Sequence, residues 1–152
     1  MSDPVYTREM LTDGSAQLVS TDCSFVFTRP RPGVLLVMIV GHDHGQFGTS
    51  ALDEIMSVLN RERPLELFVD TSDAVGVAVS VRQDWTRFFS SNRANLSAVH
   101  VLTRSKIVHV AIAVAQLFSA TGGLIRLYSR PDSFQGRLDH ARGRPIGGAL
   151  QP

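Results

Sequence analysis

The chain has 152 residues, of which 43% are hydrophobic and 19% are charged, a composition that fits one folded domain and excludes a disordered chain. Its 15 basic and 14 acidic residues leave a net charge of +1, which argues against a dedicated nucleic-acid binder. The single cysteine, Cys23, excludes a disulfide within the chain and a cysteine-rich zinc site.

Targeting and membrane segments are not expected. Residues 1–14 contain no basic segment followed by an apolar one, so the sequence predicts no signal peptide. The longest apolar runs, 34–40 and 110–114, are far shorter than the ~20 residues that a membrane-spanning helix needs. We therefore expect a cytoplasmic protein without a membrane span.

The first third of the chain predicts an antiparallel hairpin. A short extra strand fits residues 16–19, and alternating phenylalanines predict a strand at 24–28. Two prolines and a glycine predict a turn at 29–33. The apolar, β-branched run at 34–40 then predicts a strand that is buried on both faces.

Helices and strands alternate in the rest of the chain. Apolar residues at helical spacing predict helices, and short apolar runs predict strands. A polar turn is expected at 70–73, after the first of these strands. The predicted helices are 52–59, 80–89, 106–120 and 131–141, and the predicted strands are 65–69, 96–102 and 124–128.

This order predicts a single α/β domain. Its sheet should be mostly parallel, with an antiparallel first strand at or near one edge and about four helices. We expect an N-terminal extension at 1–20, the domain at 21–142 and a flexible tail at 143–152, where glycine and proline are frequent.

Residues 65–89, LELFVDTSDAVGVAVSVRQDWTRFF, resemble the STAS family of sulfate transporters and anti-sigma factor antagonists. In that family a strand ending in Asp precedes a short turn, an Asp-Ser-Ser-Gly element and a helix. In this chain, Val69-Asp70-Thr71-Ser72 is similar to the family's strand end. The position of the Asp-Ser-Ser-Gly element is occupied by Ala78-Val79-Ser80-Val81. Only Ser80 remains there, at the second serine. Val79 stands in place of the serine that is phosphorylated in anti-sigma factor antagonists.

The resemblance covers about residues 20–141, by pattern more than by identity. It implies the STAS/SEC14-like fold of stand-alone bacterial proteins. It also implies regulatory contact with a protein partner, a kinase or another regulator, at the start of the helix that follows residue 79.

Ser80 has two interpretations. With Gln83 it matches a capping box, which predicts that Ser80 is the N-cap of its helix. It is also a candidate phosphoacceptor, because the N-terminus of a helix stabilises a phosphate. Thr71 and Ser72 are alternative acceptors, expected to be more exposed, although their hydroxyls also suit a polar turn.

A His-x-His pair, His42 and His44, follows the buried strand 34–40 and offers two candidate metal ligands. Aspartates 43, 70 and 73 would supply carboxylates if the strand ends converge. A protein zinc site needs three or four ligands, and only two histidines are close in sequence. A solvated loop explains the pair better than a metal site does, so we expect no metal and no other cofactor.

Polar residues also follow each predicted parallel strand, and in an open sheet such ends gather at one edge, where ligands bind. Arg104, Lys106 and Arg130 would make this polar rim an anion site, unless they pair with surface acids. The sequence has no dinucleotide-binding or P-loop motif. The strand ends are 41–44, 70–73, 103–106 and 129–130.

These observations favour a regulatory module that is not an enzyme, because the sequence shows no catalytic motif. It would dock a protein partner through the 70–80 loop and the following helix, with Asp70, Asp73 and Arg82 in contact. The alternatives are a binding protein for a lipid or anion at the polar rim and, less favoured, a metal-dependent enzyme. A homodimer through an edge strand or the phenylalanine-bearing helix is also open.

Overall fold

The computed structural model describes residues 6–104 and 122–143, so the predicted helix at 106–120 lies outside the described residues. Within these residues two short 3₁₀ turns, Arg93–Asn95 and Gly122–Leu124, precede β6 and β7. The strands are β1 (Tyr6–Met10), β2 (Ala16–Ser20), β3 (Cys23–Arg31), β4 (Val34–Asp43), β5 (Leu65–Val77), β6 (Leu96–Leu102) and β7 (Ile125–Tyr128). The helices are α1 (Ser50–Arg61), α2 (Val79–Ser91) and α4 (Pro131–Ala141).

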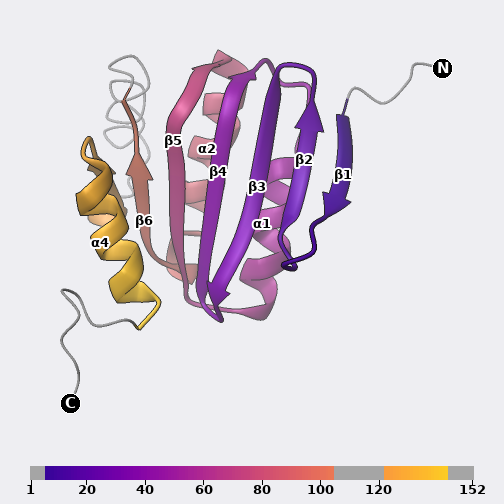
Figure 1. The fold of residues 1–152 in the computed structure, drawn as a ribbon. Helices are drawn as coiled ribbons and strands as arrows, with labels where there is room; N and C mark the ends of the chain where they lie inside the picture. Colours follow the sequence, from indigo (N-terminus) through magenta and orange to yellow (C-terminus); the bar gives the residue numbers. More distant parts are fainter. Residues whose placement is uncertain (1–5, 105–121, 144–152) are drawn as a thin grey trace.

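The described strands form one seven-stranded mixed sheet in which strand order follows the sequence, β1-β2-β3-β4-β5-β6-β7 (Figure 1). Strands β1 to β4 are antiparallel, and β4 to β7 are parallel. The α/β architecture and the hairpin of β3 and β4 are confirmed. The expectation of a mostly parallel sheet is wrong, because three of the six strand pairs in the described sheet are antiparallel. The strand expected at the edge, β3, lies inside the sheet, because β1 and β2 continue it within residues assigned to an N-terminal extension.

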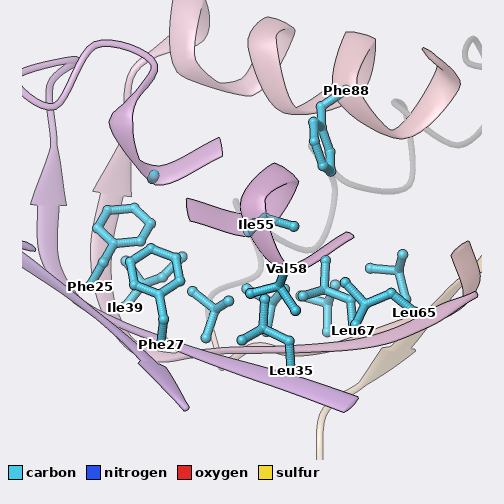
Figure 2. Close-up of a cluster of buried hydrophobic side chains, with 14 of the residues drawn as sticks. Phe25, Phe27, Leu35, Ile39, Ile55, Val58, Leu65, Leu67 and Phe88 are labelled. Carbon is cyan, nitrogen blue, oxygen red and sulfur yellow. The ribbon is translucent and has the colours of Figure 1, made fainter. Parts of the chain in front are cut away.

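The three described helices lie on opposite faces of the sheet. Helices α1 and α2 lie behind the sheet in Figure 1, and α4 lies in front of β6. Successive residues of a strand point to opposite faces. Leu67 and Val69 of β5 therefore join the large core under α1 and α2, whereas Phe68 joins a small core under α4. Figure 2 shows the large core, with Phe25 and Phe27 at one end and Leu65 at the other.

Strand β3 is longer than expected, and the predicted turn at 29–33 is wrong in its first half. Strand β3 continues through Pro30 to Arg31, and only residues 32–33 turn. Proline cannot donate a backbone hydrogen bond within a sheet. The pairing of β3 with β4 accommodates it with a register shift between Thr28 and Arg31, so the ladder skips the proline.

Strand β5 is also longer than expected, and the polar turn predicted at 70–73 is wrong. This segment continues the strand, because β4 itself extends to Asp43 and pairs with β5 as far as Val77. Two register shifts in this pairing place extra residues on β5. Such β-bulges bend a strand and redirect its side chains.

The prediction that Ser80 caps α2 is wrong. The N-cap is Ala78, in extended conformation, and it makes no side-chain capping bond. The Ala78 N–H donates to the Asp43 carbonyl at 2.9 Å, so the hydrogen bonds between β4 and β5 continue up to the residue before the helix. The helix therefore begins at Val79, and Ser80 lies in its first turn.

Candidate functional site

The carboxyl ends of the parallel strands form a step. Asp70 of β5 pairs with Leu102, the last residue of β6, and Leu102 pairs with Tyr128, the last residue of β7. Strand β5 continues beyond that level to Val77, paired with β4 only, among the residues that the structure describes. The candidate site is the protruding segment, residues 71–77, together with the first turn of α2 that follows it. We refer to this site as the step.

The predicted phosphoacceptors differ sharply in access. Thr71 is buried, and its Oγ1 donates to the Leu102 carbonyl at 2.7 Å, so its expected exposure is wrong. Ser72 is half-buried and donates to Asp70 Oδ1 from its amide at 2.9 Å and from its hydroxyl at 2.6 Å. Ser80 is exposed. Of the three hydroxyls, only that of Ser80 faces solvent freely.

Two valines are exposed at this site. The sequence analysis did not single out Val75, and it named Val79 without predicting its exposure. Val75 is 76% exposed and Val79 is 58% exposed. Gly41 pairs with Ala74 and His42 with Gly76, which leaves Val75 as the extra residue of a bulge. The bulge turns this side chain out of the core. In the sequence, Val75 stands between Ala74 and Gly76, with Val77 and Val79 at the next alternate positions, and this pattern does not reveal a bulge.

The side chains of the histidine pair contact each other and neighbouring residues of the protein. The rings of His42 and His44 stack with centroids 3.9 Å apart, and His44 Nε2 lies 3.4 Å from Asp22 Oδ2. The His42 ring rests against Gly76, where an added Cβ would lie 3.0 Å from the ring. In the described part of the chain, no three His, Cys, Asp or Glu residues are placed to hold a metal ion.

Buried acid and thiol groups lie beneath this loop. Burial raises the pKa of Asp43, although the Gly45 N–H donates to its carboxylate at 2.9 Å. Burial, with the nearby Asp43 carboxylate, raises the pKa of Cys23 to about 12. A raised pKa keeps the Cys23 thiol protonated at neutral pH and so disfavours the thiolate, which is the nucleophilic form.

The basic residues predicted to form an anion site at the polar rim are not all brought to one place among the described residues. Arg104 is exposed, and Lys106 lies outside the described residues. Arg130 is exposed and pairs with Asp132 at 3.3 Å, the surface pairing that was the alternative to an anion site. Arg82 is half-buried on α2, whereas Asp73 is exposed on the step.

The phenylalanines of α2 are not available to a dimer interface. Phe88 and Phe89 are buried in the large core, and Trp85 of the same helix stacks on Phe25 at 6.4 Å. The apolar face predicted for this helix is confirmed as a core face. The surface that α2 offers to a partner is therefore its first turn and its polar side.

Comparisons with known proteins bear on the fold. No protein-family model matches the sequence, and a search of curated proteins finds no relative. Solved structures do match. An anti-sigma factor antagonist from Mycobacterium paratuberculosis is 15% identical, with a TM-score of 0.56, over 74% of this chain and 91% of that chain. A DUF3478-family protein from Shewanella loihica, described as having a SpoIIAA-like fold, is 14% identical, with a TM-score of 0.54, over 77% and 94%.

These similarities agree with the element order and with the strand–helix segment 65–89. Among the described residues, no helix is both long enough and apolar enough to cross a lipid bilayer. The resemblance to the STAS family is confirmed at the level of the fold: the chain is an α/β domain with the SpoIIAA-like fold of anti-sigma factor antagonists.

Proposed function

We propose that this protein is a non-enzymatic regulatory module that docks a protein partner at the step. The observation that carries the proposal is the pair of exposed valines, Val75 and Val79, beside the exposed Ser80. Apolar side chains that are exposed together, rather than singly, mark interaction sites. Val75 and Val79 are four residues apart on one short segment. The solved structure of an anti-sigma factor antagonist with the same fold adds support for a regulatory role.

The docking surface combines apolar and polar contacts. The two valines supply apolar area, and Asp73 is an exposed acid on the same protruding segment. Interfaces of this kind concentrate affinity in a few apolar anchors surrounded by polar contacts. Charged substitutions of the anchors should therefore remove most of the affinity without disturbing either core.

The double variant Val75→Asp and Val79→Asp tests the docking surface. We expect it to lose the partner that the wild-type protein retains from a native lysate, because two buried, unpaired carboxylates oppose association. Met10→Asp is the matched control, since Met10 is also an exposed apolar strand residue, 60% exposed, on the edge strand β1, which does not adjoin β5. Partner retention by the double variant, or equal loss in the control, contradicts docking at the step.

We propose that Ser80 is the phosphoacceptor of this surface. A phosphate in the first turn of α2 meets the free N–H groups and the positive end of the helix dipole. The protein is incubated with native lysate and ATP, and its phosphopeptides are identified by mass spectrometry. We expect one phosphate on Ser80, absent from Ser80→Ala. Phosphate on Thr71 or Ser72, or none, contradicts the assignment.

A further inference from the structure

A buried histidine links α4 to the sheet. His100 of β6 is 0% exposed. Its Nδ1 lies 2.9 Å from the Tyr128 hydroxyl, and its Nε2 lies 2.7 Å from Glu66 Oε2. Arg137 of α4 donates to the same Glu66 oxygen at 3.1 Å. A continuous polar chain therefore runs from β7 through β6 and β5 to the helix.

The apolar contacts of α4 join the same group. The His100 ring stacks on Phe68 at 4.4 Å, and Phe68 meets Phe134 of α4 edge-to-face at 5.7 Å. Phe134 also meets the Tyr128 ring at 5.8 Å. Phe134 and Leu138 are the two buried residues of α4. Any shift of the His100 ring is thus transmitted to the main apolar anchor of the helix.

The neutral imidazole with its proton on Nε2 fits both of its hydrogen-bond partners. Its Nε2–H donates to the Glu66 carboxylate, and its Nδ1 accepts from the Tyr128 hydroxyl. The imidazolium donates at both nitrogens, so the Tyr128 hydroxyl loses its acceptor. Burial also removes water from the positively charged ring, which disfavours the imidazolium. The Glu66 carboxylate stabilises that charge, whereas Arg137 and Arg126 repel it.

The net balance favours the neutral ring. Burial is the largest cause and lowers the pKa of His100; the Glu66 hydrogen bond and charge raise it, and the two arginines lower it further. The pKa of His100 is lower when α4 is packed on the sheet than when the ring is exposed to water. The packed state is therefore fully favoured at a pH above the ordinary histidine pKa of about 6.5. That contribution is lost as the pH falls below this value, because the unpacked state binds the proton more readily.

We propose that the Tyr128–His100–Glu66–Arg137 chain is an acid-sensitive latch, in which protonation of His100 releases α4 while the sheet stays folded. Helix α4 is the element that can leave, because among the described residues its apolar contacts lie in the small core, and its other contacts are polar ones from Arg137 to Glu66 and from Arg31 to the Ala141 carbonyl. The large core, under α1 and α2, does not include His100 or α4. Release uncovers Phe68 and Leu102, which are otherwise buried.

Hydrogen exchange measured by mass spectrometry, corrected for intrinsic rates, tests the latch at about pH 7.5 and about pH 5.5, on either side of the ordinary histidine pKa. We expect amides of 131–141 to lose protection at the lower pH while amides of β3 and β4 keep theirs. Unchanged protection of α4, or simultaneous loss throughout the sheet, overturns the proposal.

Variants separate the latch from ordinary acid unfolding. His100→Gln keeps a donor and an acceptor but cannot titrate, so α4 should be equally protected at both pH values. Arg137→Gln leaves His100 in place and should reduce α4 protection already at the higher pH. His140→Gln is the matched control, because His140 is an exposed histidine of α4, and it should behave as wild type. A wild-type response in Arg137→Gln, or loss of the pH response in His140→Gln, overturns the latch.

Discussion

Replacing Gly41 with alanine is expected to destabilise the fold by at least ~4 kcal/mol, a large loss against the roughly 5–15 kcal/mol that stabilises a typical domain. Gly41 has φ +92, a conformation that L residues rarely adopt. A Cβ there would lie 2.1 Å from the Asp22 carbonyl oxygen. That oxygen cannot move away freely, because it accepts a hydrogen bond from the His42 amide at 2.8 Å.

Gly14→Ala is the control that isolates the clash. Gly14 has a similar φ of +88, but a Cβ there meets no atom within 4 Å. Its replacement should cost only the backbone strain, about 1–2 kcal/mol. Urea denaturation followed by circular dichroism gives the free energy of unfolding of both variants. Equal losses in the two would show that the approach of Gly41 to the β2–β3 turn is unimportant.

Phe25→Ala should lower the free energy of unfolding by about 3–5 kcal/mol, since it leaves a large cavity in the main core. Phe25 is 1% exposed. Its ring contacts three others, with centroids 5.2 Å from Phe47, 6.0 Å from Phe27 and 6.4 Å from Trp85. The ring thus connects β3 to the loop before α1 and to α2.

Val26→Ala provides the comparison for Phe25→Ala. Val26 is the next residue of β3, half-buried on the opposite face, so its replacement should cost about 1 kcal/mol or less. The urea midpoints of both variants are measured under the same conditions, and the slopes are checked for equality. A loss for Phe25→Ala no greater than that for Val26→Ala would contradict the assignment of the core.

Elements with a strong local pattern were predicted well. The apolar run at 34–40 lies within β4, the strand at 96–102 matches β6, and Pro131 opens α4 as expected. Strand β6 is buried on both faces apart from Ser97, so its apolar run and its tertiary environment agree. The expectation that 34–40 is buried on both faces is wrong at the end of the run: Met38 and Val40 are 40% and 46% exposed, because they lie beyond the small core under α4. Strand β1 has four exposed residues and no such signal. It is a strand only because β2 pairs with it.

The site was predicted less well than the fold. Residues 70–73 have the composition of a turn, and nothing local shows that β4 will extend beside them. That pairing makes Thr71 a buried strand residue, turns Val75 outward and moves the start of α2 ahead of Ser80. Local sequence patterns also could not predict the hydrogen-bond partners of His100, because Glu66 and Tyr128 are 34 and 28 residues away along the chain.

The amino-acid sequence by itself determined the class of the fold, because alternating strands and amphipathic helices have few ways to bury their apolar faces. It also determined which segment resembles the STAS family. The tertiary structure alone decided which side chains reach solvent at the step and which polar groups meet beneath α4. Those contacts join residues distant in the chain, and their geometry depends on strand register and on the ends of neighbouring strands, which no local pattern contains.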